Sequence, residues 1–105
     1  MVRRKYRWIF IEIISEKIPD RTHLENTLRR KSLELFGTLR APQFKLVRYN
    51  QEKGVGIIRC LREDLNKVRL ILAFTRTIDN SKIVINDALV SGTFKKLRDK
   101  IKLKI

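Results

Sequence analysis

Residues 6–14, YRWIFIEII, alternate between two sets of side chains with the two-residue period of a β-strand. β-branched and aromatic residues, which favour strands, make up most of the segment. One face would carry isoleucines and the other mainly aromatic rings. The first set is Ile9, Ile11 and Ile13, and the second is Tyr6, Trp8, Phe10 and Glu12. We therefore expect a first strand here.

The period changes to that of a helix after Pro19. Within residues 21–36, four apolar side chains fall near one helical face: Leu24, Leu28, Leu35 and Phe36. Asp20 or Thr22 is expected to cap the start of this helix, and Gly37 to stand just beyond its end.

Two further strands are predicted at residues 44–50 and 55–61, FKLVRYN and VGIIRCL. The polar loop between them ends at Gly54, which can adopt positive φ, so the pair should form a hairpin. Residues 62–74 then predict a second amphipathic helix, with acidic residues in its first turn, where the helix dipole favours them. Its apolar positions are Leu65, Val68, Ile71 and Leu72, and its first-turn acids are Glu63 and Asp64.

A fourth strand is expected at residues 82–89, KIVINDAL, after the turn signal Asp79-Asn80-Ser81. The order βαββαβ with short connections is that of an α+β, ferredoxin-like sandwich, the architecture of the RNA-recognition motif. Two helices would pack on one face of a four-stranded antiparallel sheet. With 105 residues the chain is too short for two independent cores, so we expect residues 1–105 to form a single α/β sandwich domain.

The segment LVSGTFKKLRDK, residues 89–100, predicts an added C-terminal basic helix that begins on a small turn. Its apolar positions repeat at helical spacing and are Phe94, Leu97, Ile101 and Ile105. The turn residues Ser91, Gly92 and Thr93 are expected to cap this helix, with Ser91 best placed to do so. RNA phosphate contact beside Lys95 and Lys96 is a second expected use of the same turn.

The charge balance points to an acidic polymer as the partner. There are 25 Lys and Arg against 11 Asp and Glu, a net charge of +14, which favours nucleic acid over a membrane or a protein. The basic clusters lie in several parts of the chain, which suits a large folded RNA. The candidate RNA-binding residues are Arg3, Arg4, Lys5, Arg7, Arg29, Arg30, Lys31, Lys53, Arg59, Lys95, Lys96, Arg98 and Lys100.

No apolar run reaches the ~18 residues of a membrane span, and no cleavable leader is recognisable, so we expect a soluble protein without membrane contact. One cysteine, Cys60, excludes an intramolecular disulfide, and His23 is the only histidine. A zinc site is therefore not expected, and a reducing intracellular compartment is the default. Cys60 alternates with Ile58 on the inward side of its strand, which predicts a buried, inert thiol.

Residues 53–60, KGVGIIRC, follow the skeleton of the RNP1 strand of the RNA-recognition motif, but its aromatic positions are aliphatic here. The sheet has therefore lost much of a base-stacking platform. The exposed face, with Tyr6, Trp8, Phe10 and Ile57, is expected to lie under a further helix or a protein partner rather than under bases. The C-terminal helix is one candidate for that cover.

Catalytic groups are scarce. His23 has no nucleophile tied to it, and the carboxylates fit helix capping, a turn and a strand end, so no catalytic residue and no metal site are expected. Two alternatives remain: a general RNA-binding or ribosomal protein of the same fold, and a small metal-dependent ferredoxin-like endoribonuclease of the kind found in CRISPR adaptation systems. The second lacks an aspartate at the end of the first strand, which reads Ile14-Ser15-Glu16.

Four segments carry a family resemblance: KYRWIFIEI, LELFG, GVGIIRCLREDLNKVRLILA and VSGTFKKL. The central block is the most specific, because a glycine-started strand that runs through Arg59-Cys60 into an amphipathic helix is unusual. Together the segments resemble the archaeal and eukaryotic ribonuclease P protein component 2 family, over nearly all of the chain.

The resemblance implies an accessory subunit of a ribonucleoprotein that removes the 5′ leader of precursor tRNA. The RNA subunit, with Mg²⁺, would carry the hydrolysis, and the protein would bind no cofactor itself. The implied partners are ribonuclease P RNA, precursor tRNA within the complex, and a TIM-barrel-like protein subunit in a heterotetramer, with a homodimer as an alternative. The implied location is the cytoplasm for an archaeal chain and the nucleus or nucleolus for a eukaryotic one.

Overall fold

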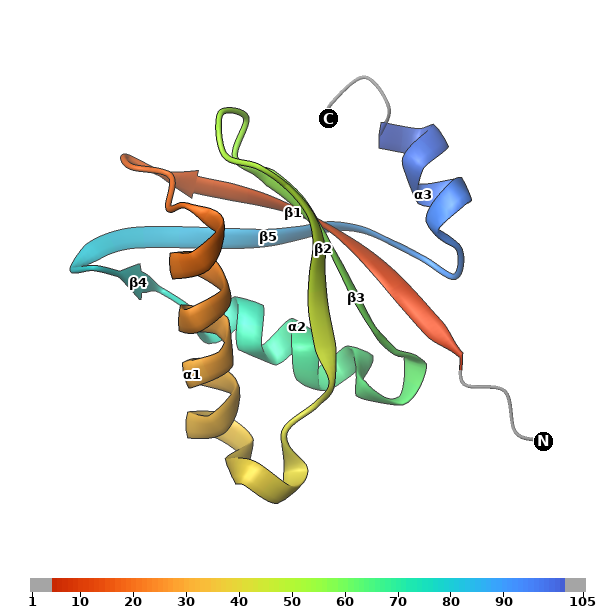
Figure 1. Cartoon of the computed structure of the whole chain (residues 1–105), viewed down its shortest axis with the longest axis horizontal. Helices are drawn as coiled ribbons and strands as arrows, with labels where there is room; N and C mark the ends of the chain where they lie inside the picture. Colours follow the sequence, from red (N-terminus) through yellow and green to blue (C-terminus); the bar gives the residue numbers. More distant parts are fainter. Residues whose placement is uncertain (1–4, 102–105) are drawn as a thin grey trace.

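The computed structural model describes residues 5–101, which form a sheet with helices on both faces (Figure 1). Ten residues of alternating pattern give a long first strand, and the last helix follows the last strand after a short turn. In chain order the elements are β1 (Tyr6–Ser15), α1 (Arg21–Arg40), β2 (Phe44–Asn50), β3 (Val55–Leu61), the 3₁₀ turn η1 (Arg62–Asp64), α2 (Leu65–Phe74), β4 (Thr77–Ile78), β5 (Ser81–Ser91) and α3 (Phe94–Ile101).

The strand order across the sheet is β2-β3-β1-β5-β4, and all neighbours are antiparallel. Without β4 this is the ferredoxin-like arrangement, so the predicted α+β fold is confirmed. The predicted count of four strands is wrong, because the sheet has five. The extra strand, β4, has only two residues and pairs with the start of β5, which begins at Ser81. So short a strand shows no period of its own in the sequence.

A tight hairpin turn connects β4 to β5. Asp79 and Asn80 have φ values of 50° and 67° between the paired residues Ile78 and Ser81. Positive φ at both central positions is the signature of a type I′ turn, which matches the right-handed twist of the strands. The predicted turn at these residues is therefore confirmed, and it closes a hairpin.

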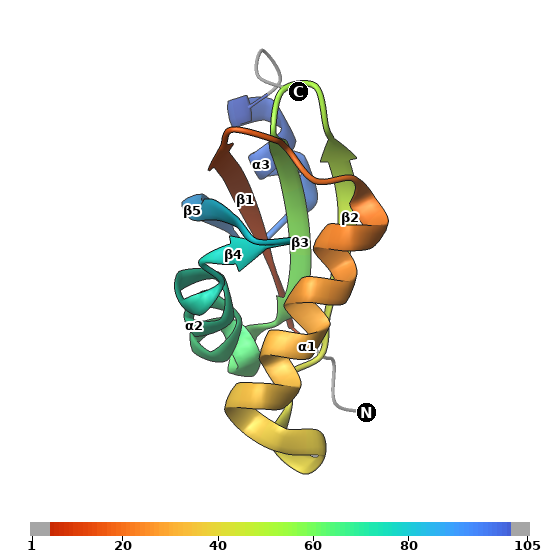
Figure 2. The ribbon, with the colours of Figure 1, turned by 90° about the vertical axis from the view of Figure 1, so that its left-hand side faces the viewer.

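Helices α1 and α2 pack side by side over one face of the sheet (Figure 2). The predicted isoleucine face of β1 lies beneath them, fully buried at Ile9 and Ile11. Leu24 and Leu28 of α1 enter the same cluster, as do the predicted core positions Val68, Ile71 and Leu72 of α2. This cluster is the main core, and the alternation of side chains along β1 correctly predicted which face of the strand contributes to it.

Helix α3 lies against the opposite face of the sheet (Figure 1). Leu97 and Ile101 are buried there against Phe10 and Ile57, and Trp8 and Phe94 pack at the margin. The expectation that a further helix covers the aromatic face is thus confirmed for the middle of the sheet. Ile105, predicted to continue the apolar stripe, lies outside the described residues.

The start of α1 is capped as predicted, whereas its end differs. The Asp20 side chain accepts a hydrogen bond from the backbone N–H of His23 at 2.8 Å. Gly37 has φ 74°, which interrupts the helix where the sequence predicts its end. One more helical turn follows, however, so the helical segment extends to Arg40 and carries an almost fully exposed Leu39.

Candidate nucleic-acid interface

The predicted RNA-binding residues fall on several faces of the molecule. Arg3 and Arg4 lie outside the described residues. Arg29, Arg30 and Lys31 lie on α1, in the helical layer. Lys53 is exposed in the loop between β2 and β3. The remaining candidates gather at the start of β1, on β3 and on α3: Lys5, Arg7, Arg59, Lys95, Lys96, Arg98 and Lys100.

Helix α3 presents the densest group of cations. Leu97 and Ile101 are turned to the sheet, whereas Lys95, Lys96 and Lys100 are exposed. None of these three lysines pairs with a carboxylate within residues 5–101; Arg98 alone approaches one, Asp99, at 3.9 Å. Unpaired surface cations are the groups that displace counterions from nucleic-acid phosphates. Within residues 5–101, the outer face of α3 therefore carries three lysines that no carboxylate neutralises.

The turn before α3 is built by two hydroxyl groups. The Thr93 Oγ1 atom accepts a hydrogen bond from the Lys96 N–H at 3.2 Å, so Thr93 is the N-cap. Ser91, which we expected to cap the helix, instead accepts from the Thr93 N–H at 3.3 Å and stabilises the turn. The Arg7 side chain passes beside Gly92, where an added Cβ would lie 3.5 Å from the Arg7 Nη1 atom. Arg7 thus lies beside the turn from which α3 starts.

Beside the N-terminus of α3, a row of aromatic rings and guanidinium groups crosses the sheet. The Arg59 guanidinium carbon lies 4.9 Å from the Tyr6 ring centroid and 5.8 Å from that of Trp8. Trp8 in turn contacts Phe94, with 5.2 Å between ring centroids. Arg48 lies 5.8 Å from the Phe94 centroid. We call these five residues, Tyr6, Arg59, Trp8, Phe94 and Arg48, the Arg-aromatic strip.

Arg48 was not among the residues predicted from the sequence. Simple alternation along β2 places it on the same face as Leu46, which is buried under the helices. A bulge between Leu46 and Arg48 shifts the register, so that Arg48 pairs with Ile57, whose side chain faces α3. An extra residue in a strand reverses the two-residue period beyond it, and alternation alone gives no sign of this.

Asp20, His23 and Cys60 have pKa values that their surroundings shift. The His23 Nδ1 atom lies 3.0 Å from Asp20 Oδ1, and this contact raises the pKa of His23. The pKa of Asp20 is lowered first by the hydrogen bond that its carboxylate accepts from the His23 backbone N–H, and then by the His23 ring. Burial raises the pKa of the Cys60 thiol to about 11, as expected for an inert cysteine. No cluster of metal-ligating side chains occurs within residues 5–101.

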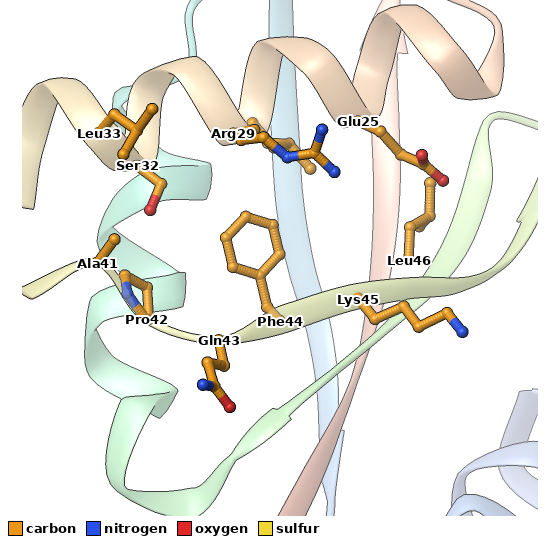
Figure 3. A pocket seen from close by; sticks show the side chains of 11 residues that line it. Glu25, Arg29, Ser32, Leu33, Ala41, Pro42, Gln43, Phe44, Lys45 and Leu46 are labelled. Carbon is orange, nitrogen blue, oxygen red and sulfur yellow. The ribbon is translucent and has the colours of Figure 1, made fainter. Parts of the chain in front are cut away.

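A groove of about 520 Å³ separates α1 from β2. Figure 3 shows the Phe44 ring projecting from β2 toward α1, opposite Arg29 and Ser32. The carboxylate of Glu25, which also lines the groove, is bound by Arg21 at 2.8 Å. In the described part of the chain, no helix is long and apolar enough to span a membrane.

Comparison with known proteins gives consistent matches along the chain. The model of the Rpp14/Pop5 family matches residues 7–102. The ribonuclease P protein component 2 of Archaeoglobus fulgidus is 34% identical over 100 residues, covering 94% of this chain and 90% of the relative. The protein of the same name from Saccharolobus solfataricus is 32% identical over 103 residues, covering 96% and 72%.

A solved structure shares the fold at low sequence identity. A chain in the cryo-EM structure of yeast ribonuclease MRP superposes with a TM-score of 0.73, covering 98% of this chain and 95% of that chain. The two sequences are 11% identical, so this likeness supports the fold and not the details of any site.

Proposed function

Because the chain belongs to the Rpp14/Pop5 family, we propose that it is a non-catalytic protein subunit of ribonuclease P. It binds and stabilises the catalytic RNA that removes the 5′ leader from precursor tRNA. The relatives named ribonuclease P protein component 2, aligned over most of their length, support this assignment. Membership of this family is also evidence against the alternative that the chain is a small metal-dependent endoribonuclease of the same fold.

The observation that carries the RNA-binding role is the unneutralised cationic surface of α3. A net charge of +14 on 105 residues opposes a compact fold by self-repulsion. Phosphates that approach Lys95, Lys96 and Lys100 would relieve this repulsion in the complex, and counterion release would favour binding. The same charges would reduce repulsion between RNA helices that must pack together.

The chemistry is assigned to the RNA with Mg²⁺ bound to it, and the protein supplies no cofactor of its own. Its part is to hold RNA segments in place through cations on more than one face. Arg29 and Arg30 on α1 lie on a different layer from the lysines of α3. Two basic faces allow one protein molecule to contact two parts of a folded RNA.

For protein partners, we propose a TIM-barrel-like ribonuclease P subunit in a heterotetramer, with precursor tRNA bound in the same complex. The helical layer offers the apolar surface that such a contact needs, at the groove between α1 and β2 and at Leu33 and Leu39, which are 47% and 99% exposed. A homodimer through this surface is the alternative. Assembly would occur in the cytoplasm of an archaeal cell or the nucleus of a eukaryotic one.

Reconstituted cleavage of precursor tRNA tests the proposal. The cognate RNA and its other proteins are assembled at limiting Mg²⁺ with and without this chain. We expect the rate of leader removal to fall when the chain is omitted and to recover at higher Mg²⁺, because the ion substitutes for the missing positive charge. An unchanged rate without this chain would refute the proposal. Equal affinity for unrelated RNAs would indicate a general RNA-binding protein instead.

A further inference from the structure

We propose that Tyr6, Arg59 and Lys45 form a binding site for one unpaired nucleotide of RNA, with its base stacked on the Tyr6–Arg59 pair and its phosphate held by Arg59 and Lys45. The proposal rests on the proposed RNA-binding function and deepens it. It names the part of the sheet that contacts RNA and the form of RNA that it accepts.

Helix α3 leaves this end of the sheet uncovered. Its buried side chains, Leu97 and Ile101, cover Phe10, Val55 and Ile57 in the middle of the sheet. Tyr6 stands at the start of β1, beyond that cluster, and is 37% exposed. A flat ring therefore remains accessible on a sheet that has otherwise lost its stacking positions.

The Arg59 guanidinium is held against this ring with its charge unneutralised. Its central carbon lies 4.9 Å from the Tyr6 centroid and 5.8 Å from that of Trp8, so the group lies over two rings. No carboxylate within residues 5–101 forms an ion pair with it. A guanidinium fixed by stacking keeps its N–H donors for an acceptor with two oxygens in reach, such as a phosphate.

A second cation stands next to Arg59. Lys45 of β2 pairs with Arg59 of β3 in the strand register and is exposed. Both side chains line a cavity of about 130 Å³ together with Tyr6 and Gln43. This volume is well below the roughly 300–1,000 Å³ of sites for drug-sized ligands, so it suits a single ring system. The Gln43 amide gives the cavity one neutral donor and acceptor for a base edge.

The composition of the cavity favours RNA over protein as its occupant. Two cations and an exposed phenol in one small cavity match the combination of stacking and phosphate contact that binds single-stranded nucleic acid. A double helix presents no free base face to Tyr6, so the nucleotide must be unpaired.

The single tryptophan of the chain gives a direct measurement, because Trp8 contacts Arg59. The full chain is titrated with a six-nucleotide oligouridylate while Trp8 fluorescence is recorded. We expect saturable quenching in the wild type. Tyr6→Leu and Arg59→Lys should each weaken the affinity by about ten-fold, whereas Tyr6→Phe should retain it. Thermal unfolding of each variant confirms that the fold is intact.

Arg76→Lys serves as the matched control, since Arg76 is exposed and lies outside the strip, and it should bind as the wild type does. Binding of ribonuclease P RNA, measured in parallel, separates the two proposals. If the wild type binds that RNA but not the oligonucleotide, the nucleotide site is refuted alone; if it binds neither, both proposals fail. Tyr6→Leu and Arg59→Lys could instead leave the oligonucleotide affinity unchanged and prevent assembly with protein subunits. Tyr6 and Arg59 would then contact protein, and the nucleotide site would be refuted.

Discussion

The rings of Trp8 and Phe94 meet with 5.2 Å between their centroids and 56° between their planes. This contact joins the first strand to the last helix of the described chain. It fixes the start of α3 beside the Arg-aromatic strip, so the strip and the lysines of α3 form adjoining parts of one surface. The docking of α3 on the sheet thus determines where its lysines lie relative to the strip.

Leu97→Ala should destabilise this docking. Leu97 is fully buried against the sheet, and truncation of a buried leucine typically costs about 2–5 kcal/mol. We expect a loss near the lower end, about 2 kcal/mol, because a terminal helix can relax around the cavity. Urea denaturation followed by Trp8 fluorescence measures the free energy of unfolding.

Leu39→Ala, at a leucine that is 99% exposed, is the matched control and should change this free energy by less than about 0.5 kcal/mol. Equal effects in the two variants would contradict the docked helix.

Lys95→Glu combined with Lys96→Glu should weaken RNA binding and leave the fold intact. Both side chains are exposed and have no carboxylate partner in the described chain. Each lysine that contacts a phosphate contributes about one unit to the slope of log affinity against log salt. The slope should therefore fall by about two in binding measured across a salt series.

The double variant Lys17→Glu with Lys82→Glu changes the net charge by the same amount at a different part of the surface. We expect its salt slope to stay close to that of the wild type. Identical slopes in the two double variants would mean that net charge alone governs binding, and the α3 surface would lose its assigned role.

The sequence predicted elements well where one side-chain period runs unbroken. The bounds of β2 and β3 match the predicted residues 44–50 and 55–61, and the two faces of β1 separate the two cores as expected. Each face of these strands meets a separate apolar layer, so the residues buried in one layer recur at every second position of the sequence.

The predictions of strand faces and strand number failed where the backbone is locally irregular. The β2 bulge turns Arg48 toward Phe94, and the two-residue β4 has no period to recognise. The Arg-aromatic strip depends on that bulge and on where α3 docks, and both are tertiary features. The sequence therefore identified Tyr6, Trp8 and Arg59 as candidates without showing that they stack on one another.

His23 should titrate above its ordinary pKa of 6.5, because Asp20 accepts a hydrogen bond from its ring. Its contribution to stability is then full below pH 6.5 and lost as pH rises through the raised pKa. The Asp20 contribution is present above pH 3.8 and lost as pH falls through its lowered pKa. As the chain has one histidine, its ring resonances can be followed by NMR without overlap from another imidazole.

Asp20→Asn keeps a capping oxygen but removes the charge, so the His23 pKa should return toward 6.5. Asp99→Asn on α3 is the control and should leave the midpoint where it was. The pairing of His23 with Asp20 would be disproved by an unshifted midpoint in Asp20→Asn.

Cys60 should react with thiol reagents only when the protein unfolds. It is buried, and its pKa of about 11 leaves about one thiol in a thousand ionised at pH 8. Labelling should be slow in buffer and fast in high urea. Fast labelling of the folded protein would show that the β3 strand opens, contrary to its burial in the main core.

Co-purification tests the central claim most directly. The chain is isolated from native extract of its source under mild salt, and the RNA bound to it is sequenced. We predict that ribonuclease P RNA is the dominant species, accompanied by precursor tRNA, and that Lys95→Glu with Lys96→Glu reduces its recovery. A broad mixture of RNAs with no enrichment of ribonuclease P RNA would contradict the assignment.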